Sequence, residues 1–108
     1  MTSEATALVE FLLGRVEEDE RIADHVAAVS PTADIGFCVW ATQFAFDPER
    51  MIVAIDYQRV RAECAAKRRI VEAFRTAAPA TAETLEVVLR ELTFAHADHP
   101  DYRDEWRI

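Results

Sequence analysis

The chain has 108 residues, of which 51% are hydrophobic and 30% charged, and it contains four prolines and two glycines. This composition is typical of a folded protein and excludes a low-complexity or disordered chain, so we expect a single domain over residues 1–108. The net charge of −8 argues against a nucleic-acid backbone as the main partner, because such binding requires an excess of lysine and arginine.

The sequence predicts neither a membrane span nor a secretion signal. The most apolar segment, Ile35 to Phe46, is well short of the roughly 20 residues that cross a bilayer, and no basic segment precedes an apolar run near the beginning. The two cysteines, Cys38 and Cys64, are isolated and do not indicate a disulfide framework. We therefore expect a cytoplasmic protein with reduced cysteines and no contact with a membrane.

The first predicted element is a long amphipathic helix that begins after Thr2 or Ser3 and ends near Val29. Its apolar residues recur at steps of three and four, which predicts one buried stripe. These residues are Leu8, Phe11, Leu12, Val16, Ile22, Ala23, Val26 and Val29. At about 1.5 Å per residue such a helix is roughly 40 Å long, more than a small core needs, so we expect part of it to contact a partner.

Residues 35–55 have a different pattern. Aromatic and β-branched residues lie on both sides of the polar segment 47–50, which contains Pro48, and this predicts a β-hairpin. A two-stranded hairpin is marginal by itself, so it must pack against the helices or against another molecule. Its aromatic residues Trp40 and Phe44 are therefore candidate contacts for a partner.

Asp56 is a favourable N-cap for a second helix over residues 57–78, which Pro79 ends. Its expected buried face comprises Tyr57, Val60, Cys64, Ile70, Val71, Phe74 and Ala78. Six basic and two acidic residues give this helix a net charge of +4, whereas the segments before and after it are acidic. We expect these charges to complement one another along the helices. The alternative for Lys67, Arg68 and Arg69 is a contact with phosphate or nucleic acid.

Thr81 is the expected cap of a third helix, which ends near His96. Its expected buried face comprises Leu85, Val88, Leu89, Leu92 and Ala95. Pro100 then suits the first position of a short terminal turn capped by His99.

The residues after the third helix hold the strongest concentration of possible metal ligands, His96, Asp98, His99 and Asp101. A metal-dependent hydrolase would need a further ligand, such as His25, from elsewhere in the fold. We favour the interpretation that these residues stabilise a helix terminus, with His96 near the last carbonyls and the two aspartates near the next turn. Tyr102 and Trp106, four residues apart, are candidate contacts for a partner. For Trp106, however, we prefer a role in docking the terminal turn onto the core.

The sequence lacks the glycine-rich nucleotide-binding loops and the serine nucleophile turn of known enzymes. With only Gly14 and Gly36, it has neither a phosphate-binding P-loop nor a dinucleotide-binding loop, and Ser3 and Ser30 do not lie in a glycine-flanked nucleophile turn. We therefore expect no enzymatic activity and no cofactor. The acidic run 17–20 allows one further alternative, a mimic of the DNA backbone, although such a run is more commonly a solvated helix face.

Three segments resemble a family of small actinobacterial and actinophage proteins, domain-of-unknown-function family 6221. They are LVEFLLGRVEEDE from Leu8, RVRAECAAKRRIVE from Arg59 and LRELTFAHADHPDYRDEWR from Leu89. The resemblance implies an actinobacterial or phage setting and carries no activity or site residue. Many relatives have a longer segment between the second and third motifs, with Cys and His, where this chain has the short connection 73–84.

The sequence as a whole predicts an α-rich α+β fold of three amphipathic helices with a small β-hairpin between the first two. The expected function is that of a non-enzymatic accessory factor that binds another protein or its own copy. A nucleic-acid-related binder and a small metal-dependent hydrolase are the alternatives.

Overall fold

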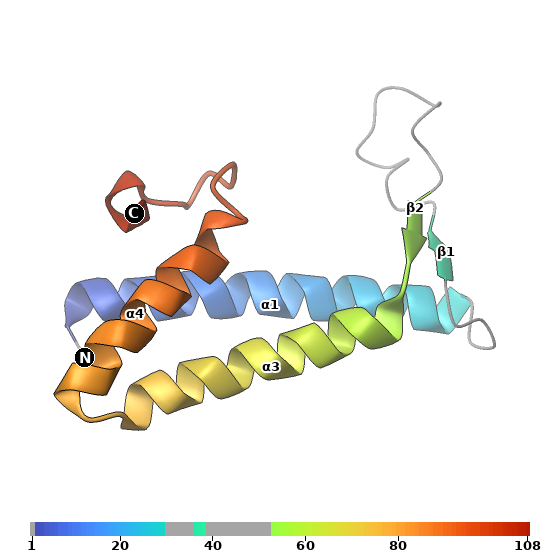
Figure 1. The fold of residues 1–108 in the computed structure, drawn as a ribbon. Helices are drawn as coiled ribbons and strands as arrows, with labels where there is room; N and C mark the ends of the chain where they lie inside the picture. Colours follow the sequence, from blue (N-terminus) through green and yellow to red (C-terminus); the bar gives the residue numbers. More distant parts are fainter. Residues whose placement is uncertain (1, 30–35, 39–52) are drawn as a thin grey trace. The chain divides into compact units, whose positions relative to one another are not determined.

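The structure is a computed structural model of the chain, and it describes residues 2–29, 36–38 and 53–108. Its elements in chain order are α1 (Ser3–Val29), β1 (Gly36–Cys38), β2 (Val53–Ile55), α3 (Tyr57–Thr76), α4 (Pro79–Phe94) and the 3-10 turn η2 (Asp104–Trp106) (Figure 1). They form two compact units, Met1–Glu17 with Ala65–Ile108 and Glu18–Cys64. We describe each unit separately. In the parts of the chain that the structure describes, no helix is long and apolar enough to span a membrane.

Side chains cap the first two long helices where the sequence predicts it. The Ala5 N–H donates to Thr2 Oγ1 at 3.1 Å, which satisfies one of the free amides at the beginning of α1. The Arg59 N–H donates to Asp56 Oδ1 at 3.0 Å and caps α3 in the same way. Both predicted caps are confirmed, because capping depends on residues adjacent in sequence.

The predicted cap of the third helix was wrong. α4 begins at Pro79, and the preceding Ala78 makes no side-chain capping bond. Proline suits the first helical position because its fixed φ is helical and it lacks the N–H that would have no partner there. Thr81 consequently lies inside the first turn of α4, two residues after its beginning.

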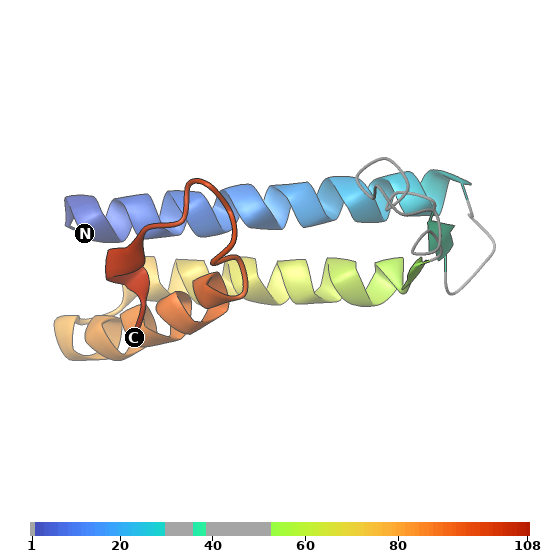
Figure 2. The ribbon, with the colours of Figure 1, turned by 90° about the horizontal axis from the view of Figure 1, so that it is seen from above.

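The first unit has its core among the beginning of α1, the end of α3, α4 and the C-terminal turn (Figures 1 and 2). Its buried residues are Ala5, Leu8, Val9, Phe11, Leu12, Val71, Phe74, Leu89 and Trp106. Each large aliphatic side chain removed from water stabilises the unit by about 1.5–3 kcal/mol. Thr93 is also fully buried, and its hydroxyl donates to the Leu89 carbonyl at 2.6 Å, so its polar atom has a partner.

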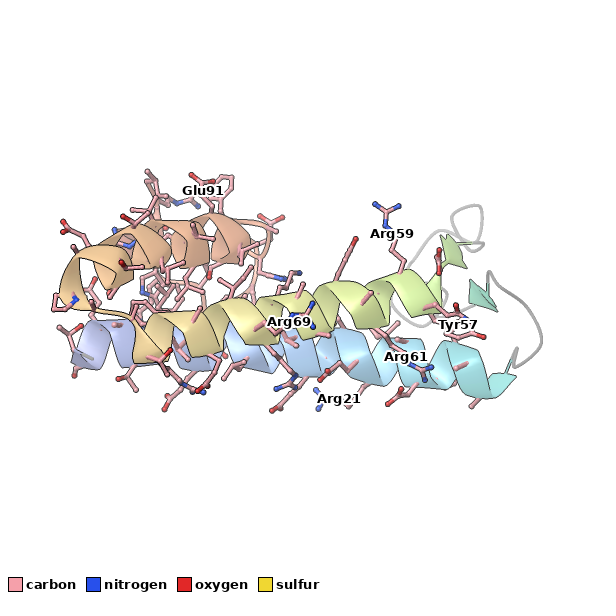
Figure 3. All side chains as sticks on the ribbon, turned by 60° about the horizontal axis from the view of Figure 1, so that its bottom comes forward. Arg21, Tyr57, Arg59, Arg61, Arg69 and Glu91 are labelled. Atoms are coloured by element: carbon pink, nitrogen blue, oxygen red, sulfur yellow. The ribbon has the colours of Figure 1, made fainter. Side chains whose placement is uncertain are left out.

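The second unit has a smaller core, in which Ala23 and Val26 of α1 pack with Tyr57 of α3. An ion pair joins the same two helices at 2.7 Å, from Arg61 Nη2 to Asp24 Oδ1 (Figure 3). Arg61 also lies over the Tyr57 ring, 5.4 Å from its centroid. The stripe predicted on the first helix is therefore buried against the chain itself in this unit, as it is at Leu8 and Leu12 in the first.

The prediction of an α+β fold was wrong: across the described residues the fold is helical, with α1, α3 and α4 as its long elements. β1 and β2 pair antiparallel through three residue pairs, from Gly36 with Ile55 to Cys38 with Val53. A pairing of this length is far below the usual strand of about five or six residues and does not form a layer of the fold. The aromatic and β-branched content of 35–55 indicated strands, but β-propensity reflects a suitable packing surface more than an intrinsic preference. Residues 39–52 lie outside the described residues.

Candidate functional site

The segment His96–Asp101, the candidate metal site, forms turns after α4. His99 Nδ1 accepts a hydrogen bond from the Asp101 N–H at 3.0 Å, and its ring meets the Phe11 ring edge-on, with centroids 5.4 Å apart. His99 thus stabilises the turn and contacts the core. The sequence predicted a terminal helical turn that begins at Pro100, but the 3-10 turn η2 begins only at Asp104. Across the described ranges no group of three or more His, Cys, Asp or Glu side chains gathers into a metal site.

Tyr102 and Trp106, two of the candidate contact residues, belong to an aromatic cluster of the first unit. Trp106 is only 2% exposed, and its ring lies 5.1 Å from that of Phe11 and 5.6 Å from that of Tyr102. The preferred role of Trp106, docking of the terminal turn onto the core, is confirmed. Trp106 Nε1 and the Tyr102 hydroxyl are both buried without a hydrogen-bond partner. Both rings therefore pack against other aromatic rings of the same chain.

The basic run of α3 is mostly exposed: Arg68 and Arg69 are exposed, and Lys67 is half-buried. Complementary pairing between helices is confirmed at Arg61, whereas other arginines of α3 pair within their own helix. Examples are Arg59 with Glu63 at 3.1 Å and Arg75 with Glu72 at 3.8 Å. Exposed pairs of this kind contribute less than about 1 kcal/mol. The aromatic candidates Trp40 and Phe44 lie outside the described residues.

A cavity of about 350 Å³ lies in the first unit, near the beginnings of α1 and α4. Its apolar lining includes Ala5, Phe74 and Ala82. Glu83, Glu86 and Arg75 also line it. Because charges of both signs line the cavity, they do not select one class of ligand.

Within the described parts of the chain, large exposed apolar side chains lie on the side of α4 that faces away from the core and at Ile108. Val87 is 50% exposed, Phe94 52% and Ile108 74%. Val87, Glu91 and Phe94 follow one another at steps of four and three, so they share one face of the helix. Figure 3 shows Glu91 pointing away from the remainder of the first unit. We call the surface formed by Val87, Glu91, Phe94 and Ile108 the outer face of α4.

The outer face of α4 contains a hollow as well as apolar side chains. Glu91, Phe94 and Ile108 line a hollow of about 140 Å³. The guanidinium carbon of Arg107 lies 5.7 Å from the centroid of the Phe94 ring, a cation–π contact with one of the side chains that line the hollow. The face therefore combines an apolar surface with both a carboxylate and a cation.

Sequence reasoning missed the outer face of α4 because three apolar residues, Val87, Val88 and Leu89, are consecutive. Of the predicted buried face, Leu89 is fully buried as expected, but Val88 is 36% exposed and Ala95 is exposed. Thr93, four residues after Leu89, is fully buried, although it was not among the predicted buried residues. The signal available in the sequence was the second apolar line from Val87 to Phe94, which Glu91 interrupts.

Comparison with known proteins gives a family and nothing finer. The model of DUF6221, a family of unknown function, matches residues 5–108. No curated protein and no solved structure matches the chain. Because the match covers nearly the whole chain, including all three motifs of the resemblance, the chain belongs to the family of unknown function DUF6221.

Proposed function

We propose that this protein is a non-enzymatic interaction factor that binds a protein partner through the outer face of α4. The observation that carries the proposal is the exposure of Val87 and Phe94 on the side of α4 opposite the core, with the exposed Ile108 beside Phe94. Large apolar side chains grouped on a surface, bordered by charges, are typical of protein interaction sites. Single exposed apolar residues would carry no such argument.

One of the features that first suggested a partner, the long first helix, no longer supports it, and the aromatic candidates Trp40 and Phe44 lie outside the described residues. The long first helix buries Leu8 and Leu12 in one unit and Val26 in the other, so its stripe is occupied by the chain itself. The proposal therefore moves from that helix to α4. The cytoplasm of an actinobacterium, with the protein encoded by the bacterium or by its phage, is part of the proposal, and the resemblance of the three motifs supports it.

Site-specific photo-crosslinking in living cells tests the proposal. A photoreactive p-benzoylphenylalanine in place of Val87 is expected to form a discrete adduct with a protein, identifiable by mass spectrometry. The same group in place of Ala73, an exposed residue of α3 in the same unit, is the control and is expected to give none. If neither Val87 nor Phe94, replaced in turn, forms an adduct above the control, the outer face of α4 is not an interaction surface.

A further inference from the structure

The partner of the outer face of α4 can be inferred from the shape of that face. We propose that this face binds the same face of a second copy of the chain, with the two α4 helices antiparallel about a two-fold axis between Arg90 and Glu91. The inference rests on the proposed function, because it names the partner of that same surface.

The first argument is shape. Val87 projects from the helix, and the hollow lined by Glu91, Phe94 and Ile108 follows it along the same face. Two copies related by a two-fold axis bury the same surface on each side. An axis midway between Val87 and Phe94 places Val87 of each copy opposite Phe94 of the other, at the hollow. A volume of about 140 Å³ exceeds the roughly 30 Å³ of one water several times and accommodates an aliphatic side chain.

The second argument is charge. Arg90 and Glu91 are adjacent in sequence at the proposed axis, so in the antiparallel arrangement each Glu91 lies beside Arg90 of the other copy. Arg90 is half-buried, and Glu91 is exposed. A carboxylate from a second copy would give the Arg90 guanidinium an acceptor. It would also neutralise Glu91 at the centre of an otherwise apolar face.

The size of the face sets the expected strength of association. One helix face and one additional residue bury less than the roughly 1,200 Å² of a standard interface, which is typical of weak and transient complexes. The chain also carries a net charge of −8, which opposes close approach of two copies. We therefore expect a dimer that forms in the micromolar to millimolar range and dissociates on dilution.

Sedimentation velocity of the purified full chain, from low micromolar to millimolar concentration, tests the inference. The native protein is expected to change from monomer to dimer over this range. Val87→Asp is expected to raise the dissociation constant at least about tenfold, because it places a carboxylate in the hollow of the other copy. Ala73→Asp, the same charge on an exposed residue of α3, is the control and should leave the dissociation constant unchanged. Circular dichroism checks that each variant remains folded.

A charge exchange tests the register of the two helices. Arg90→Glu and Glu91→Arg are each expected to weaken the dimer, and the two together to restore it, because the double variant recreates opposite charges across the axis. A protein that is monomeric at millimolar concentration overturns the inference. So does a dimer that is insensitive to Val87→Asp, or one that the double charge exchange does not restore.

These outcomes are distinguishable from failure of the proposed function. A monomeric protein whose Val87 position still forms an adduct with a different protein in cells retains the proposed function and loses only the second copy as partner. A protein that is monomeric and forms no adduct loses both.

Discussion

Truncation of Trp106 is the sharpest test of the first unit. The indole is 2% exposed and contacts the rings of Phe11 and Tyr102 within 6 Å, so Trp106→Ala removes a large buried side chain and leaves a cavity. Such truncations cost about 3–5 kcal/mol. Because Nε1 is buried without a partner, the variant also removes an unsatisfied donor, which offsets about 1 kcal/mol or more of the loss. We therefore expect Trp106→Ala to lower the free energy of unfolding by about 3 kcal/mol.

Urea unfolding followed by circular dichroism measures this loss. With a denaturant slope of about 1–3 kcal/mol per molar, the midpoint is expected to fall by about 1–3 M. Trp106→Phe is expected to cost less than the alanine variant, since it retains an aromatic ring and has no buried N–H to satisfy. Glu105→Ala, an exposed neighbour in the same turn, is the control and should change the stability by about 0.5 kcal/mol or less. A loss below about 1 kcal/mol for Trp106→Ala would refute the placement of the terminal turn in the core.

Other perturbations probe separate parts of the molecule. Gly14→Ala is expected to raise the free energy of unfolding by about 0.5–1 kcal/mol, because Gly14 lies inside α1 and an added Cβ meets nothing within 4 Å. A lower urea midpoint than that of the native protein would contradict this expectation. Asp56→Ala is expected to cost about 1 kcal/mol through loss of the α3 cap, whereas Asp56→Asn should retain most of it, and equal losses would argue against capping. Fluorescence anisotropy with duplex DNA and single-stranded RNA at low salt is expected to show no binding; binding that Lys67→Glu with Arg68→Glu abolishes would instead support a nucleic-acid function. The melting temperature of chelator-treated protein is expected to be unchanged by zinc or manganese. A clear rise in the melting temperature on adding either metal would support a metal site.

The sequence determined the helices and their local contacts. Thr2 and Asp56 cap α1 and α3 as predicted, and residues such as Leu8, Leu12 and Val71 are buried at the spacing of their stripes. Caps and helical periodicity depend on residues within about four positions of one another, so their chemistry can be read from the order of the residues. The sequence also placed the end of the third helix near His96, and α4 ends at Phe94, with His96–Asp101 in the turns that follow.

Only the tertiary structure decided the fold class and the place of the candidate interaction surface. β-branched and aromatic residues predicted a hairpin, but whether they form a layer depends on what packs against them, which no local pattern records. In α4, Val87, Val88 and Leu89 are all apolar, and the helical spacing placed Leu89 in the core correctly but placed Val88 there as well. The packing of Leu89 and Thr93 inward turns Val87 and Phe94 outward, and this rotation of a single helix creates its outer face.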